Sequence, residues 1–319
     1  MYQGKSLCIR CDAGAGLNSN NNYNIEEKEM DFRSGKELLE LCGQTGLPIS
    51  RIMKKREMEL QGISEQEADR KMSKSLDIMR SSANDPLENE TTSMGGLIGG
   101  EAKKLGKLRA EGKSICGAMV SKAMTYAMAV LEVNASMGVI VAAPTAGSSG
   151  VLPGVLLALQ EELGLPDEKV MDGLYTAGAV GYLLMRNASV AGAQAGCQAE
   201  VGSASAMAAA AAVEMMGGTP GQALSAATGA LSNLLGLVCD PIGGLVESPC
   251  QNRNSIGAAN ALLNAEQALA GIEQFIPFDE MVQAMYHVGR SLPFELRESA
   301  LGGCAATPAA CGISCMSGK

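Results

Sequence analysis

The sequence of 319 residues lacks an excess of positive charge. Its 25 Lys and Arg residues stand against 34 Asp and Glu residues, which gives a formal net charge of −9. Proteins that bind nucleic acid or an anionic membrane do so through a basic patch, so both partners are disfavoured. Small metabolites are therefore the expected ligands.

Long apolar segments are also absent. The richest stretch, SAMAAAAAVEMMGG, is interrupted by Glu214, whereas a membrane-spanning helix needs about 20 consecutive apolar residues. The amino terminus shows no basic segment followed by an apolar one, which is the pattern of a secretion signal. We therefore expect a cytoplasmic protein with no membrane span.

Aromatic residues and strand patterns are scarce. The sequence has no Trp, one His and 3% aromatic residues, and only GVIVAAP at 138–144 has the composition of a strand. Apolar residues recur instead at helical spacing, and abundant Ala and Gly let helix axes approach closely. The predicted fold class is all-α: a compact helical domain with Gly-rich loops between Ala-rich helices and little or no strand. Helices are expected around Leu38–Cys42, at 48–60, from the capping box at Ser64 to about residue 85, and at 114–135, 151–164, 168–186, 203–216, 220–235 and 254–270.

The first 29 residues differ from the rest. They are Asn-rich and show no apolar periodicity, so residues 1–29 are predicted to be a disordered leader or extension, with Met30 a candidate natural start. Cys8 and Cys11 form half of a zinc-site pattern without a second half nearby, so no structural metal site is expected there. Residues 30–319 are predicted to form the helical domain.

Two cysteines bracket the turn-rich segment CDPIGGLVESPC at 239–250. In a helix their sulfurs would lie roughly 16 Å apart, too far to share a metal or a disulfide. The two prolines and the Gly-Gly pair between them are turn residues, so we expect the chain to fold back and bring Cys239 near Cys250. Ten cysteines are too few at this chain length to indicate a disulfide-stapled secreted domain, so reduced thiols are expected, some of them ligands.

Two further Gly-rich segments precede apolar helices. APTAGSSGVLPG at 143–154 exposes backbone N–H groups and hydroxyls that suit a carboxylate or a phosphate, although an ordinary helix cap has the same composition. It lacks the Gly-Lys-Ser/Thr of a phosphate loop, so a nucleotide is disfavoured. Cys197 stands at the start of an Ala-rich helix, where the helix dipole is expected to lower its pKa. The alternative is a small buried hydrophobic residue.

These segments resemble a known family. APTAGSSGVLPGVL, GCQAEVGSASAMAAA, GLVCDPIGGLVESPCQNRNSIGAANA and LRESALGGCAATP are similar to the alpha chain of the iron–sulfur-dependent L-serine dehydratases, over most of residues 30–310. The resemblance implies that Cys197, Cys239 and Cys250 hold a [4Fe-4S] cluster whose fourth iron is open, that pyridoxal phosphate is not used, and that a separate beta chain exists. In some relatives a cysteine at the carboxyl terminus occupies the open iron. Cys304, Cys311 and Cys315 are the candidates here.

An open iron explains why three thiolates, and not the four of an electron carrier, are implied. The resemblance implies that such an iron would act as a Lewis acid on the β-hydroxyl of L-serine and make hydroxide a better leaving group, while a base would remove the α-proton. The aminoacrylate product then yields pyruvate and ammonia. For the substrate carboxylate, the candidates are Arg253 and the loop residues Thr145, Gly147, Ser148, Ser149 and Gly150. Arg253 is alternatively an ordinary surface arginine.

The general base is not resolved by the sequence. His287, the only histidine, titrates near neutrality but is not tied by any pattern to the cysteine segments. Lys113 is a weak candidate, as are Lys103 and Lys104. Three alternatives to the serine lyase stay open: an iron–sulfur electron-transfer or redox-sensing protein, a related lyase acting on threonine or cysteine, and a helical protein with structural cysteines only.

Overall fold

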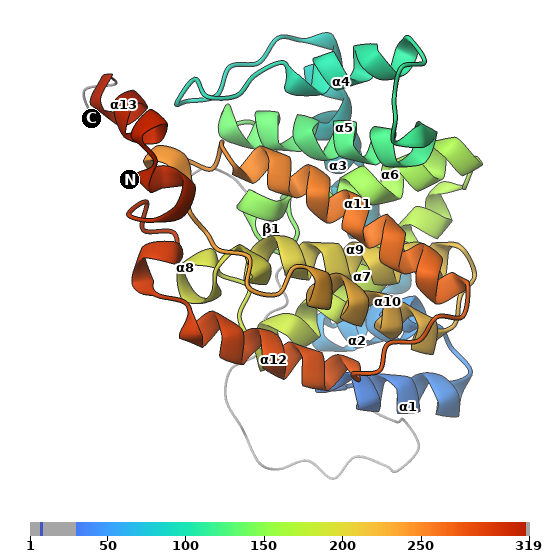
Figure 1. Cartoon of the computed structure of the whole chain (residues 1–319). Helices are drawn as coiled ribbons and strands as arrows, with labels where there is room; N and C mark the ends of the chain where they lie inside the picture. Colours follow the sequence, from blue (N-terminus) through green and yellow to red (C-terminus); the bar gives the residue numbers. More distant parts are fainter. Residues whose placement is uncertain (1–6, 9–29, 317–319) are drawn as a thin grey trace.

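The structure is a computed structural model that describes residues 7–8 and 30–316, and its regular secondary structure is almost entirely helical (Figure 1). The α-helices are α1 Gly35–Thr45, α2 Ile49–Gln61, α3 Glu65–Glu88, α4 Glu101–Ala110, α5 Gly117–Ala135, α6 Val151–Leu163, α7 Asp167–Asn187, α8 Gly192–Ala195, α9 Ser203–Met215, α10 Pro220–Asn233, α11 Cys250–Leu269, α12 Phe278–Ser291 and α13 Pro308–Met316. Short 3-10 helices are η1 Ala146–Ser148, η3 Ile242–Gly244, η4 Phe294–Leu296 and η5 Gly303–Ala306, and η2 Gln198–Gly202 is a π-helical turn. Strands β1 Leu7–Cys8 and β2 Val141–Ala142 pair in parallel.

The all-α prediction is confirmed, with differences at particular helices. Helix α4 was not predicted because it carries no apolar stripe: only Ala102 of its residues is buried. Helix α11 begins at Cys250, four residues before the predicted start, because Pro249 already occupies its N-cap position. Apart from the strand at residues 7–8, the predicted leader lies outside the described residues. None of the helices that the structure describes is long and apolar enough to cross a membrane.

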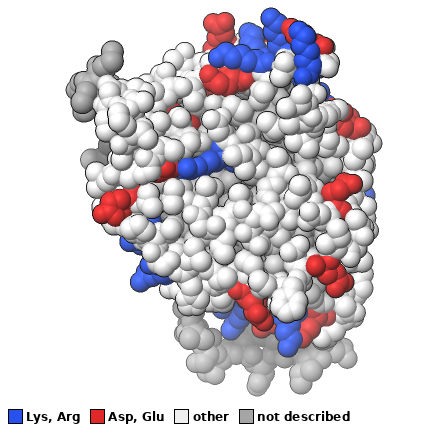
Figure 2. Space-filling model, in the orientation of Figure 1, with Lys and Arg blue, Asp and Glu red and all other residues white. Residues whose placement is uncertain are grey.

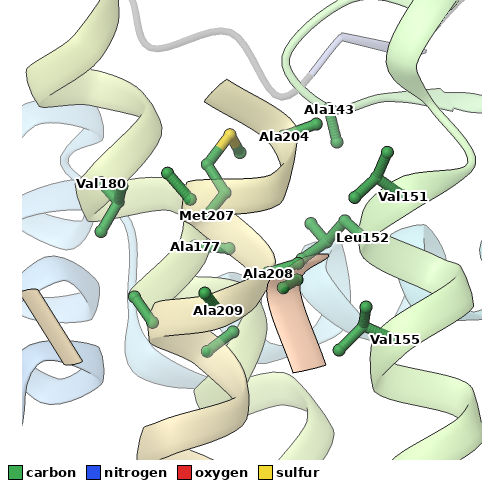
Figure 3. Close-up of a cluster of buried hydrophobic side chains, with 14 of the residues drawn as sticks. Ala143, Val151, Leu152, Val155, Ala177, Val180, Ala204, Met207, Ala208 and Ala209 are labelled. Atoms are coloured by element: carbon green, nitrogen blue, oxygen red, sulfur yellow. The ribbon is translucent and has the colours of Figure 1, made fainter. Parts of the chain in front are cut away.

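Helix α9 lies at the centre of the helical assembly, and its small side chains explain the packing. Residues 208–212 are all alanine, with at most 1% of their surface exposed. Ala204, Met207 and Ala208 lie between side chains of α6 and of α7 (Figure 3). Small residues let helix axes approach closely, so one central helix can contact several neighbours.

The junction of α5 and α6 depends on a glycine. A Cβ built on Gly154 of α6 would lie 2.7 Å from the carbonyl oxygen of Ala123 and 3.0 Å from the Cβ of Ala127. We expect Gly154→Ala to lower the free energy of unfolding by about 1–3 kcal/mol, since the backbone of α5 must shift. Gly43 of α1 has no atom within 4 Å of its built Cβ, so Gly43→Ala should instead stabilise the protein by about 0.5–1 kcal/mol. Urea denaturation of both variants tests this, and equal effects would contradict the close approach.

Candidate functional site

The segment between Cys239 and Cys250 folds back as the turn residues predict. The N–H of Ile242 donates to the carbonyl oxygen of Ser248 at 2.9 Å, which closes the loop. Gly243 and Gly244 have φ values of 63° and 72°, which L side chains rarely adopt. Burial and the nearby Glu200 carboxylate raise the pKa of Cys239, and Cys197 and Cys250 lie close enough to contribute to the same shift. Cys197, Cys239 and Cys250 are therefore near enough to influence one another's pKa.

Gln198 fixes Cys197 beside this loop, although it was not predicted as a site residue. Its backbone N–H donates to the carbonyl oxygen of Leu237 at 2.9 Å. Its side-chain oxygen accepts from the N–H of Gly236 at 2.8 Å, and its side-chain nitrogen donates to the carbonyl oxygen of Met285. The side chain is buried. These bonds join the segment around Cys197 to the chain that leads into Cys239.

The three cysteine side chains are buried, and burial dominates their acidity. Burial raises the pKa of Cys197 and of Cys250 to about 12, and raises that of Cys239 far above its ordinary value. The expected lowering of the Cys197 pKa by a helix dipole is therefore wrong, because desolvation penalises a thiolate more than the helix start favours it. The positive charge of nearby Arg253 opposes this increase at Cys197 and Cys250 but does not cancel it. Thiolates at these positions need additional positive charge.

The donor set fits an iron–sulfur group. Three buried thiols with little neutralising charge around them are the ligand type that such clusters use. Gly192 keeps space beside them: a Cβ there would lie 3.0 Å from the Cys239 sulfur. Among the described side chains, no group of three His, Cys, Asp or Glu residues is arranged to hold a single metal ion. Ligands of a multi-iron cluster stand further apart than those of one ion, so this finding concerns single-ion sites and not a cluster.

Most polar groups of the Thr145–Gly150 loop are already hydrogen-bonded. The hydroxyls of Thr145 and Ser148 lie 3.0 Å apart, and that of Ser149 donates to the carbonyl oxygen of Ala146. The Gly150 N–H donates to Asn254 Oδ1 at 3.0 Å. Within the described part of the chain, the backbone N–H groups of Ala146 and Gly147 make no hydrogen bond. These two are the donors that the loop leaves for a ligand.

Asn254 links this loop to Cys250. Besides accepting from Gly150, its side-chain nitrogen donates to the carbonyl oxygens of Gly147 at 2.8 Å and Cys250 at 3.0 Å. The residue is fully buried. Asn254 therefore holds the predicted substrate loop against the first turn of α11, a role that the motif QNRN alone does not indicate.

Arg253 is not an ordinary surface arginine. Its side chain is 12% exposed and pairs with buried Asp240, with Nη1 and Oδ1 2.7 Å apart. Nη1 also donates to the carbonyl oxygen of Val238 at 2.8 Å. Its other guanidinium nitrogens make no hydrogen bond to a described residue, so they are available to a carboxylate. Burial lowers the pKa of Arg253, but the hydrogen bond to Asp240 and the charge of Asp240 oppose this. Together with contributions from nearby Cys197 and Cys250, they raise the pKa overall.

The carboxyl-terminal segment packs against Cys239 and Asp240. The N–H of Cys239 donates to the carbonyl oxygen of Leu296, and the N–H of Glu298 donates to that of Cys239 at 2.7 Å. The N–H of Cys304 donates to Asp240 Oδ2 at 2.6 Å, which puts this tail cysteine next to the Asp240–Arg253 pair. Cys311 is exposed on α13. The side chain of Cys315 lies outside the described residues.

None of the predicted bases lies in this neighbourhood. His287 is exposed on α12, and its described ring contact is with Tyr286. Lys113 pairs with Glu111, and Lys104 with Glu101. Lys103 and Lys104 belong to α4, and Lys113 follows that helix. Figure 2 shows a group of charged side chains at the upper edge of this face, where Figure 1 places α4.

Glu200 is the ionisable residue that the sequence analysis missed. It follows Cys197 by three residues, within the π-helical turn η2. It accepts a hydrogen bond from the Thr145 hydroxyl at 2.8 Å and lies 3.8 Å from the Cys239 sulfur. Burial raises the pKa of its carboxyl group. Glu200 thus joins the loop to the cysteines.

Comparisons with known proteins match a region of the chain that includes Cys197, Cys239 and Cys250. The family described as serine dehydratase alpha chain matches residues 44–305. The probable L-serine dehydratase alpha chain of Bacillus subtilis is 49% identical over 277 residues, which cover 87% of this chain and 92% of that protein. The L-serine dehydratase alpha chain of Peptoniphilus asaccharolyticus is 45% identical over 86% of this chain and 94% of its own length. The L-serine dehydratase of Streptomyces coelicolor is 38% identical, and the match covers 86% of this chain but 60% of that protein.

Proposed function

Because this chain belongs to the serine dehydratase alpha chain family, we propose that it is the alpha chain of a lyase that converts L-serine to pyruvate and ammonia. The observation that carries the proposal is the gathering of three buried cysteines beside a loop with free N–H donors. We propose Cys197, Cys239 and Cys250 as the ligands of a [4Fe-4S] cluster, and a reaction without pyridoxal phosphate. When bound, the cluster supplies a Lewis-acidic iron for the serine hydroxyl.

The chain's own residues would hold the substrate and keep water out. The free N–H groups of Ala146 and Gly147 and the free guanidinium nitrogens of Arg253 are the proposed partners of the carboxylate. The cysteine side chains are 3–8% exposed, so the reacting groups would meet little bulk water.

A second polypeptide is part of the proposal. The match to the Bacillus subtilis alpha chain covers nearly all of that protein, whereas the match to the Streptomyces coelicolor enzyme leaves 40% of it uncovered, from 100% − 60%. The region that the longer relative carries in one chain would be supplied here by a separate beta chain. The alpha chain alone should then be weakly active or inactive, and co-expression with the beta chain should restore activity.

The test is turnover by the anaerobically purified complex. We expect bound iron and sulfide, a visible absorbance band, and pyruvate formed from L-serine. L-Threonine and L-cysteine assayed in parallel distinguish the related lyases. Iron and sulfide without turnover of any of these three amino acids would favour an electron-transfer or redox-sensing protein. Absence of iron would favour a helical protein whose cysteines are only structural.

Activity should be lost in air. An iron with an open position is accessible to oxidants and can dissociate, so exposure to oxygen should remove activity and iron together, and ferrous iron with thiol should restore both. Circular dichroism of the same samples provides the control, because the helical fold should persist. Activity that survives loss of the absorbance band would contradict a catalytic role for the cluster.

A further inference from the structure

Glu200 lies where the substrate loop meets the cysteines. Its carboxylate oxygen Oε1 accepts a hydrogen bond from the Thr145 hydroxyl at 2.8 Å. The other oxygen, Oε2, lies 3.8 Å from the Cys239 sulfur. Glycines on both sides make room for it. A Cβ on Gly192 would lie 2.5 Å from its Oε2, and a Cβ on Gly147 would lie 3.3 Å from its Oε1. A side chain at either glycine would therefore crowd the space that the Glu200 carboxylate occupies.

The carboxylate has no cationic partner within the chain. No Lys, Arg or His of the described residues forms an ion pair with Glu200; its hydrogen-bond partners are a hydroxyl and a thiol, and its charged neighbour Glu298 has the same sign. Nearby Arg253 is paired with Asp240 instead. A carboxylate removed from water requires a compensating positive charge. Glu200 is nevertheless not fully buried as a residue.

We propose that Glu200 binds the ammonium group of the amino acid substrate, an assignment that rests on the proposed function. An α-amino acid is a zwitterion, and this site offers complementary groups at two adjacent places. The N–H groups of Ala146 and Gly147 suit its carboxylate, and the Glu200 carboxylate suits its ammonium. The bond from Thr145 fixes the carboxylate in place. The site would therefore select α-amino acids over α-hydroxy acids of the same shape.

L-Alanine and L-lactate are matched probes, because they share size and carboxylate and differ in an ammonium against a hydroxyl. Their binding to the anaerobic, iron-loaded alpha–beta complex can be measured by isothermal titration calorimetry, which needs no turnover. We expect the unmodified complex to bind L-alanine at least about tenfold more tightly than L-lactate. Glu200→Gln should weaken L-alanine binding about ten- to a hundredfold and leave L-lactate binding nearly unchanged. The KM for L-serine should rise accordingly.

The controls separate this role from structural ones. Glu298→Gln removes an exposed negative charge from the same neighbourhood and should change L-alanine binding less than about threefold. Glu200→Asp keeps the charge and should retain much of the preference for L-alanine. Iron content and melting temperature of each variant show whether the site is intact.

Three results would overturn the proposal. One is an unmodified complex without preference for L-alanine, a measurement that needs no variant. Another is equal weakening of both probes in Glu200→Gln, which indicates an indirect structural effect. The third is unchanged L-alanine binding with reduced kcat, which indicates a role in the reaction other than ammonium binding. Selective L-alanine binding by a complex that does not turn over L-serine would instead contradict the proposed function alone.

Discussion

Replacing Cys197, Cys239 or Cys250 with serine is expected to abolish bound iron and L-serine turnover together. A serine hydroxyl is a poor substitute for a thiolate, and a cluster held by three protein ligands has none in reserve. All three are proposed as ligands of one cluster, so each single change should have the same outcome. Iron and sulfide analysis with a pyruvate assay on one preparation measures both effects.

Two other cysteines serve as controls. Cys42 is as buried as the proposed ligands but lies in the hydrophobic core on α1, and Cys116 is exposed before α5. Cys42→Ser should lower stability by about 1–3 kcal/mol through a buried hydroxyl, and Cys116→Ser should leave stability nearly unchanged. Both should retain iron. Full iron loading in any of the three ligand variants would contradict the assignment.

Arg253→Met should destabilise the protein by about 3–5 kcal/mol, because it leaves the buried Asp240 carboxylate without its cation. The double variant Arg253→Met/Asp240→Asn should recover most of this loss. An asparagine side chain is neutral and still accepts the hydrogen bond that the Cys304 N–H makes at 2.6 Å. Urea denaturation of these two variants and of the unmodified protein gives the free energies of unfolding.

An exposed arginine provides the comparison. Arg290 in the last turn of α12 is exposed, so Arg290→Met should change stability by less than about 0.5 kcal/mol. If Arg253 binds the substrate carboxylate as well, the double variant should regain stability but not its KM for L-serine. A stable Arg253→Met variant with only a raised KM would show that the Asp240 pair is unimportant and substrate binding is the main role.

Local patterns were enough to predict most helices. Ser64 begins α3 by accepting from the N–H of Glu67, as one half of the predicted capping box requires. Turn residues between Cys239 and Cys250 predicted the reversal that the structure contains. Helix α4 escaped prediction because its charged sequence buries only Ala102, so nothing periodic marks it. These outcomes follow from interactions within a few residues of one another.

The sequence by itself determined the helical fold class and the three cysteine segments, since apolar periodicity, caps and turns act over a few residues. Only the tertiary structure decided what surrounds the cysteines. The contact of Glu200 with Thr145 spans 55 positions, and that of Asn254 with Gly147 spans 107. The Cys197 pKa likewise depends on burial by distant helices, which outweighs the local helix start. Charge, burial and hydrogen bonding at the site are set by neighbours that only folding brings together.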